Sequence, residues 1–322
     1  MNLNGLTVAV TGGAGLVGSH IVDQLVDEGA KVRVLDNFAR GRREYLDDAA
    51  SRGDVAIVEA DLQDQDAIRE LLSGADLAVH QASAWLRQCQ DIPRMSLDVT
   101  ITGTFNLLEE CVRQGVKKVV AASSSSVYGE ASYLPTDEDH PYNNDLFYGA
   151  AKVCNEQHYR AFYKKYGLDY VAFRYLNVFG PRQPKHAAYM DVIMHFLNKI
   201  EAGESPMVRG DGSATIDLIY VADVARANLL ALKNEKVTDV ALNVCSGKET
   251  SVKELAEILI RMKGKEGEIA PVFTEMDGGL VTRRCGCPKK VKELLGFEAT
   301  TSIEDGMQAV IDWRTKTDLT DA

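Results

Sequence analysis

The segment Thr11-Gly-Gly-Ala-Gly-Leu-Val-Gly18 decides the fold. A short apolar, β-branched run precedes it at residues 6–10 and predicts a buried parallel strand. Apolar residues then recur at helical spacing, which predicts a helix over residues 14–29. A second strand over residues 31–35 ends on Asp36. Strand, glycine turn, helix, strand and terminal acid is the order that a dinucleotide-binding unit requires.

The residue types in this segment fit the parts of a dinucleotide. Glycine lets the turn close and lets the backbone approach a pyrophosphate at the positive end of the helix. Asp36 is expected to accept hydrogen bonds from the adenosine ribose hydroxyls and to repel a 2′-phosphate, which favours NAD over NADP. Arg40, Arg42 and Arg43 follow closely and argue the other way. We interpret them as a solvated basic loop.

Composition and charge exclude several classes of protein. The 322 residues carry a formal net charge of −11, which disfavours binding to nucleic acid or to anionic membranes. No apolar run reaches membrane-spanning length, and the first strand begins too early for a signal peptide. The six scattered cysteines predict a reducing, cytoplasmic location. Cys285-Gly-Cys287 is too closely spaced for zinc and lacks a second pair, so no metal site is expected.

Strands and helices alternate along the rest of the chain. Further strands are predicted at residues 55–58, 76–80, 118–122 and 170–175, and the intervening helices at residues 95–114 and 148–166, with one more ending near Gly74. This order predicts an α/β fold, a Rossmann-type doubly wound parallel sheet with a smaller C-terminal substrate-binding lobe. We assign residues 1–178 to the NAD-binding domain, with segments near 214–246 returning to it, and residues 179–322 mainly to the lobe.

The candidate catalytic residues lie between Ser123 and Lys152. A serine-rich segment follows the fifth strand, and Tyr148 and Lys152 come later, four residues apart and so on one face of a helix. An ammonium group beside a phenol, like a positive nicotinamide ring, lowers the pKa of the phenol, so Tyr148 is expected to act as a general base. Ser124 is expected to bridge this phenol and a substrate hydroxyl. For Tyr128, a packing role and a catalytic role remain equally open.

These motifs resemble, in their order, those of the extended short-chain dehydrogenase/reductases. Within them the chain is similar to the NAD-dependent nucleotide-sugar epimerases and dehydratases, closest to UDP-glucose and UDP-glucuronate 4-epimerases, over nearly its whole length. The matching segments are residues 11–18, 36–37, 61–62, 103–104, 124–129, 148–152, 174–182, 217–225 and 243–247. The resemblance implies that Tyr148 removes the proton of the sugar 4-hydroxyl while NAD takes hydride from C4. The 4-keto sugar then turns, and hydride returns to its other face.

The same resemblance implies a set of site residues. The catalytic residues are Ser124, Tyr148 and Lys152. The cofactor, NAD, contacts Gly12, Gly15, Leu16, Val17, Gly18, Asp36, Asn37, Asp61, Leu62, Gln81, Ala82, Ser83, Tyr148, Lys152 and Tyr175. The nucleotide sugar, expected to be UDP-linked, contacts Ser125, Ser126, Asn177, Arg182, Arg209 and Arg283. Helices 95–114 and 147–166 are expected to form a homodimer, as in relatives.

The chain also departs from the pattern of the family. The 4,6-dehydratases carry an Asp–Glu pair where this chain has Ser125 and Ser126, so dehydration is disfavoured. Ile216 and Met276 stand where many relatives have arginines that bind the diphosphate. Arg283, Arg284 or Arg209 are the candidates to replace them.

Three alternatives to a 4-epimerase stay open at this point. A UDP-glucuronate decarboxylase also begins by oxidising C4, and Lys185 and His186 would place positive charge near a C6 carboxylate, unless they belong to a solvated loop. A simple NAD-dependent dehydrogenase would release NADH. A non-catalytic NAD-binding regulatory protein would keep the fold but has no need of Ser124, Tyr148 and Lys152 together.

Overall fold

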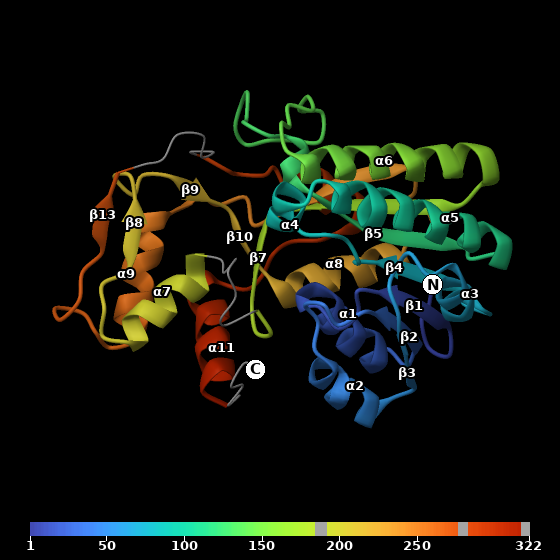
Figure 1. Cartoon of the computed structure of the whole chain (residues 1–322), viewed down its shortest axis with the longest axis horizontal. Helices are drawn as coiled ribbons and strands as arrows, with labels where there is room; N and C mark the ends of the chain where they lie inside the picture. The colour runs from blue at the N-terminus through green and yellow to red at the C-terminus, as the bar shows by residue number, and fades with distance from the viewer. Residues whose placement is uncertain (184–191, 276–282, 317–322) are drawn as a thin grey trace.

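A seven-stranded parallel sheet forms the centre of the larger part of the molecule (Figure 1). The computed structural model describes residues 1–183, 192–275 and 283–316. The strands lie in the order β11-β6-β5-β4-β1-β2-β3. Their bounds are β1 Thr7–Thr11, β2 Lys31–Asp36, β3 Val55–Glu59, β4 Leu77–His80, β5 Lys118–Ser124, β6 Asp169–Tyr175 and β11 Val240–Val244. The predicted α/β fold with a doubly wound parallel sheet is therefore confirmed.

Helices cover both faces of this sheet and bury two separate apolar clusters against it. On one face lie α1 Leu16–Asp27, α8 Val221–Lys233 and α10 Lys289–Leu295. On the other face lie α3 Gln65–Leu72, α5 Gly103–Gln114 and α6 Phe147–Tyr166. The short helices α2 Asp47–Arg52 and α4 Leu86–Asp91 and the 3-10 helices Arg43–Leu46 and Ser125–Val127 lie in connections between these elements. Because the side chains on both faces of the sheet are buried, the strands are continuous apolar runs and do not alternate between apolar and polar residues.

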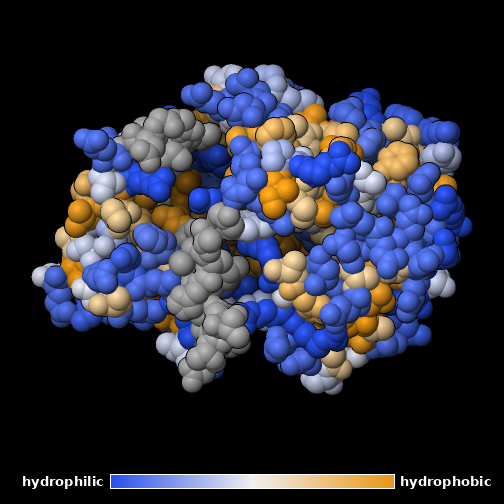
Figure 2. Space-filling model, in the orientation of Figure 1, coloured by the Kyte–Doolittle hydropathy of each residue, from blue (hydrophilic) through white to orange (hydrophobic). Residues whose placement is uncertain are grey.

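A smaller part of the molecule has its own apolar cluster. Its helices are α7 Val192–Glu201, α9 Val252–Met262 and α11 Ile303–Lys316. Three two-stranded sheets accompany them, namely β7 Asn177–Phe179 with β10 Leu218–Tyr220, β9 Thr215–Ile216 with β12 Thr250–Ser251, and β8 Met207–Arg209 with β13 Val272–Thr274. Figure 2 shows that the face seen there is hollowed between the two parts. The domain boundaries given above remain a prediction.

The helix expected over residues 95–114 is present but not uniform. Its first part, Ser96–Thr102, is π-helical, and only Gly103–Gln114 is α-helical. At the junction, a Cβ atom on Gly103 would lie 2.8 Å from the Leu62 side chain, so the helix passes close to the segment that follows β3. In the part of the chain that the structure describes, none of the helices combines the length and apolarity needed to cross a membrane. All six cysteines are free thiols.

The order of the strands places the candidate site. From β1 the chain runs outward through β2 to β3 and then returns to the opposite side of β1 at β4, so the strand order reverses between β1 and β4. In open parallel sheets, ligands bind beyond the carboxyl ends of the strands at such a switch point. The glycine turn after β1 and residues 81–84 after β4 both lie there.

His80, at the end of β4, gives the fold a predicted sensitivity to acid. The imidazole is buried between the hydroxyls of Thr11 and Thr104, at 2.7 and 2.9 Å, and burial followed by the charge of Lys152 lowers its pKa from 6.5 to about 3. Between these two pKa values the unfolded chain binds a proton that folded His80 does not. His80 is therefore expected to cost the protein about 2 kcal/mol of unfolding free energy when the pH falls from 7 to 5.

Denaturant unfolding at several pH values measures this effect. A His80→Gln variant, which keeps hydrogen-bonding groups beside both threonines, is expected to lose stability less steeply with acid than the wild type does. An identical slope in the two proteins would contradict the assignment. The comparison is made between slopes because His20, whose pKa burial lowers to about 4, contributes equally to both.

Candidate functional site

The glycine turn between β1 and α1 is too tight for side chains at two of its positions. At Gly18, a Cβ atom would lie 2.1 Å from the Gly12 carbonyl oxygen and 2.8 Å from the Gly13 Cα. Gly12 has a φ of +67°, and a Cβ atom there would lie 2.7 Å from the backbone nitrogen of Ala82. Glycine therefore allows the start of α1 to pack on the end of β1, and it leaves the helix N-terminus open to an anion.

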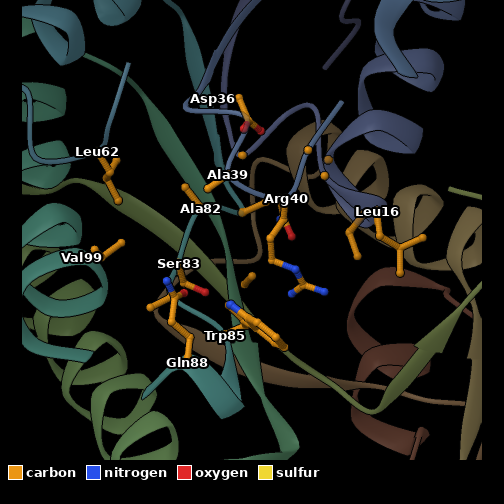
Figure 3. A pocket seen from close by; sticks show the side chains of 18 of the residues that line it. Leu16, Asp36, Ala39, Arg40, Leu62, Ala82, Ser83, Trp85, Gln88 and Val99 are labelled. Carbon is orange, nitrogen blue, oxygen red and sulfur yellow. The ribbon is translucent and has the colours of Figure 1, made fainter. Parts of the chain in front are cut away.

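A cavity of about 540 Å³ adjoins this turn (Figure 3). Every residue expected to contact NAD lines it, as do Ser124 and Arg182. The cavity extends from Asp36, the last residue of β2, and Asp61, just after β3, to Tyr148 and Lys152 on α6. A volume of this size and a lining of mixed polar and apolar residues fit an extended organic cofactor. No group of three or more His, Cys, Asp or Glu side chains arranged for a metal ion occurs among the described residues.

Asp36 is held in place by the backbone at one end of the cavity. One carboxylate oxygen accepts a hydrogen bond from the Ala14 N–H at 2.9 Å, and the other accepts one from the Phe38 N–H at 2.8 Å. Burial raises the pKa of this carboxyl, and the two N–H donors oppose that rise. Beside it, the Asn37 side-chain amide donates to a carboxylate oxygen of Asp61 at 2.8 Å. These carboxylates bring hydrogen-bond acceptors and negative charge to this end of the cavity.

Ser124, Tyr148 and Lys152 meet at the other end of the cavity. The Lys152 ammonium nitrogen lies 5.5 Å from the centre of the Tyr148 ring and donates to the Ala122 carbonyl at 2.9 Å. The Ser124 hydroxyl acts on the Tyr148 phenol and lowers its pKa. Ser124 also donates to the Ser126 hydroxyl at 3.1 Å. The structure thus brings together the three residues predicted to be catalytic.

The predicted lowering of the Tyr148 pKa by Lys152 is wrong for the protein alone. Burial raises the pKa of the Tyr148 phenol to about 12, although the Ser124 hydroxyl and the charge of Arg40 act in the opposite direction. Burial also lowers the pKa of Lys152 to about 8. Desolvation of the phenolate outweighs an ammonium that points at a backbone carbonyl. A further positive charge in the cavity would lower this pKa and favour the phenolate.

A buried ionic network joins α6, which carries Tyr148 and Lys152, to the central sheet. The guanidinium of Arg174 on β6 forms two hydrogen bonds with Glu156 of α6, at 2.7 and 3.0 Å. Arg174 also donates to the hydroxyl of Tyr128, which donates to Asn243 of β11 at 2.7 Å. Tyr128 thus belongs to this network and lies outside the cavity lining. Glu156 lies one helical turn beyond Lys152, so the network fixes the position of α6 relative to the sheet.

The residues expected to contact the sugar nucleotide are dispersed. Arg182 lines the cavity and forms an ion pair with Asp23 of α1 at 2.8 Å. Asn177 donates from its side chain to the Asp217 carbonyl at 3.1 Å. Ser125 and Ser126 lie in the 3-10 helix after β5, and Arg209 is exposed at the end of β8. Lys185, His186 and Met276 lie outside the described residues. Only Arg182 of the six candidates is part of the cavity lining.

Arg283 and Arg284 have different surroundings. Arg283 pairs with Thr215 in a parallel bridge, and both side chains bond to Glu249. Side chains alternate along extended chains, so Arg284 and Ile216 point to the opposite side. Arg284 is half-buried, and burial lowers the pKa of its guanidinium. Within the described segments, no carboxylate forms an ion pair with it.

Arg40 corrects the interpretation of the basic loop. Arg43 is solvated and pairs with Glu59 at 2.8 Å, as that interpretation requires. Arg40 instead lines the cavity, with its guanidinium carbon 4.2 Å from the centre of the Trp85 ring (Figure 3). Trp85 and Gln88 also line the cavity and were not predicted. The available signal was the position of residues 81–88, directly after a buried parallel strand.

The fold and the cavity define a dinucleotide-binding α/β protein, and comparisons with known proteins specify its family. Residues 8–245 match the model of the NAD dependent epimerase/dehydratase family. The chain belongs to this family, and its cofactor is NAD.

The similarity to individual members of this family extends over nearly the whole chain. The chain is 38% identical to a putative UDP-glucose 4-epimerase of Methanocaldococcus jannaschii, over 95% of this chain and 97% of that protein. It is 30% identical to a UDP-N-acetyl-alpha-D-glucosaminuronate decarboxylase of Bacillus cytotoxicus, over 94% and 96% respectively. The crystal structure of UDP-glucose 4-epimerase from Thermotoga maritima with UDP-glucose superposes with a TM-score of 0.89 at 32% identity, covering 97% and 99% of the two chains.

Proposed function

We propose that this protein is an NAD-dependent nucleotide-sugar 4-epimerase acting on a UDP-hexose or UDP-hexuronate. The observation that carries the proposal is the meeting of Ser124, Tyr148 and Lys152 at one end of a cavity whose other end is formed by the glycine turn and Asp36. Bound NAD would supply the hydride acceptor and donor, and its positive ring would favour the phenolate. The similarity to UDP-glucose 4-epimerases over nearly the full chain supports this choice of substrate class.

In this proposal the protein residues handle the proton and the position of the sugar. Tyr148 takes the proton of the sugar 4-hydroxyl and returns one after the 4-keto sugar has turned. Ser124, which lines the cavity together with Tyr148, positions the same sugar hydroxyl. Lys152 keeps the phenol ring and the cofactor ribose in place from one turn further along α6. Serines at 125 and 126 leave the site without the acid pair that elimination of water requires.

A decarboxylase is the second candidate, because a relative with that activity is 30% identical over 94% of this chain. A decarboxylase converts a UDP-hexuronate into a pentose derivative and releases carbon dioxide, whereas an epimerase conserves every carbon atom. A dehydrogenase accumulates NADH. A regulatory protein converts no substrate and accumulates no NADH.

Absorbance of NADH at 340 nm distinguishes a dehydrogenase from the proposed epimerase. Purified protein given UDP-glucose or UDP-glucuronate and excess NAD is expected to convert its substrate with no lasting rise in absorbance. A rise that follows the amount of substrate consumed would contradict the proposal and identify a dehydrogenase.

We also propose that Arg284, on the same side as Ile216, contacts the diphosphate of the substrate. Arg284→Ala is expected to raise KM for the UDP-sugar at least about tenfold with a smaller change in kcat, because one charge-assisted contact to a phosphate is lost. The loss for Arg283→Ala is expected to be smaller, since Glu249 already pairs with that guanidinium. Equal effects of the two substitutions in steady-state kinetics would contradict this assignment.

A homodimer and a cytoplasmic location complete the proposal. Leu97, Phe105 and Phe147 are exposed on the two helical segments expected to pair between copies. A dimer interface formed by these segments would cover those apolar side chains. Light scattering at working concentration tests this, and a monomeric mass would contradict it.

A further inference from the structure

We propose that Arg40 and Trp85 form a clamp on the pyrophosphate of bound NAD, in which Arg40 supplies positive charge and Trp85 holds its guanidinium. This inference rests on the proposed placement of NAD in the cavity and does not depend on which sugar reacts. It assigns a cofactor contact to Arg40, which the sequence pattern places in a solvated loop, and to Trp85, which that pattern does not predict.

The two residues reach the cavity from opposite sides of the glycine turn. Arg40 lies in the connection after β2, and Trp85 lies in the connection after β4. β2 and β4 flank β1, and the glycine turn follows β1. Figure 3 shows the Arg40 side chain extending toward the Trp85 ring inside the cavity. A guanidinium 4.2 Å from the centre of an indole ring is in the range of a cation–π contact.

The backbone next to Arg40 is fixed to the glycine turn. The Arg42 N–H donates to the Ala14 carbonyl at 3.2 Å. A Cβ atom on Gly41 would lie 2.8 Å from Ala14, so this loop and the turn are in direct contact. Asp36 binds the Ala14 N–H from the start of the same loop. The loop therefore holds the Arg40 backbone beside the N-terminus of α1, where a pyrophosphate would bind.

The other charges of the cavity explain what Arg40 adds. Asp36 and Asp61 bring negative charge to the cavity, and a pyrophosphate brings two more negative charges. Among the cations in the described lining, Lys152 lies at the Tyr148 end beside the Ala122 carbonyl, and Arg182 lies beside Asp23 of α1. Arg40 lies between these ends, and its charge also reaches Tyr148. A guanidinium stacked on an indole loses less freedom when it binds a phosphate.

Displacement of bound NAD tests the clamp on the intact holoprotein. The NAD retained by the protein is measured after incubation with increasing ADP-ribose or adenosine, two competitors that differ by the pyrophosphate and the second ribose. The ratio of the concentrations that displace half of the NAD does not depend on the affinity for NAD itself. For Arg40→Ala we expect the advantage of ADP-ribose over adenosine to fall about 10- to 100-fold, the size of one charge-assisted contact.

Matched variants make the result specific. Trp85→Leu is expected to reduce the advantage of ADP-ribose over adenosine by a smaller factor, because the guanidinium remains but loses its contact with the indole ring. Arg43→Ala is expected to leave it unchanged, since Arg43 carries the same charge in the same loop but pairs with Glu59 outside the cavity lining.

Three results would overturn the proposal. The first is an Arg40→Ala variant in which ADP-ribose keeps its full advantage over adenosine. The second is a fall in this advantage that is equally large in Arg43→Ala. The third is an Arg40→Ala variant that loses only its ability to bind NADP in place of NAD. The last would assign Arg40 to a 2′-phosphate. No sugar is present in this experiment, so its failure is distinct from a failure of the proposed epimerase activity.

Discussion

Replacement of Tyr148 by phenylalanine is expected to lower kcat about 10²- to 10⁴-fold while the protein keeps its NAD, because the substitution removes one hydroxyl that acts as the general base. In the wild type, the aromatic ring of Tyr148 is part of the cavity lining. Phenylalanine keeps that ring and its contact with the ammonium group of Lys152. Turnover of a UDP-sugar and the NAD content of the purified variant are the two quantities to measure.

Tyr133→Phe is the matched control for this experiment. Tyr133 is exposed, its hydroxyl bonds to Asp137, and it does not line the cavity. The Tyr133→Phe substitution also removes a phenolic hydroxyl, and this variant is expected to keep wild-type turnover. Wild-type turnover in Tyr148→Phe would remove Tyr148 from the catalytic role, whereas loss of NAD in that variant would show a structural effect instead.

Replacement of Arg174 by methionine is expected to lower the unfolding free energy by about 3–5 kcal/mol, because it leaves the buried carboxylate of Glu156 without its ion-pair partner. Both side chains of this pair are about 5% exposed or less. The remaining partners of Glu156, the hydroxyls of Ser123 and Tyr142, are neutral. Denaturant unfolding monitored by circular dichroism measures the effect.

Two further variants test the cause of this loss. Arg69→Met breaks an exposed ion pair with Asp66 on α3 and is expected to change stability by no more than about 1 kcal/mol. Adding Glu156→Leu to Arg174→Met removes the unpaired charge, so the double variant is expected to be more stable than Arg174→Met alone. A double variant that is less stable by the sum of both losses would contradict this explanation.

The features predicted correctly from the sequence are those that depend on local patterns. The glycine turn, the strand that ends on Asp36 and the pair Tyr148/Lys152 each lie within one strand or helix and its adjoining turn, so their spacing already fixes their arrangement. The carboxyl ends of parallel strands gather at one edge of the sheet. That rule is sufficient to bring Asp61, Gln81 and Ser124 to the same cavity.

The features that sequence patterns miss depend on contacts between distant segments. The high pKa of Tyr148 arises from burial by the whole cavity wall, which the four-residue spacing to Lys152 does not show. The local sequence indicates a solvated Arg40 because Trp85, whose ring its guanidinium contacts, lies 45 residues further along the chain. The difference between Arg283 and Arg284 depends on Glu249 and Thr215, which precede them by more than 30 residues.

The most direct test of the proposed function is anomeric proton NMR of UDP-sugars incubated with the purified protein and no added cofactor. The set contains UDP-glucose, UDP-glucuronate and their N-acetyl and pentose counterparts. We predict that one substrate is converted into its C4 epimer until both are present at equilibrium, with no loss of carbon. A pentose product from UDP-glucuronate, or no conversion of any of these sugars, would contradict the proposed 4-epimerase activity.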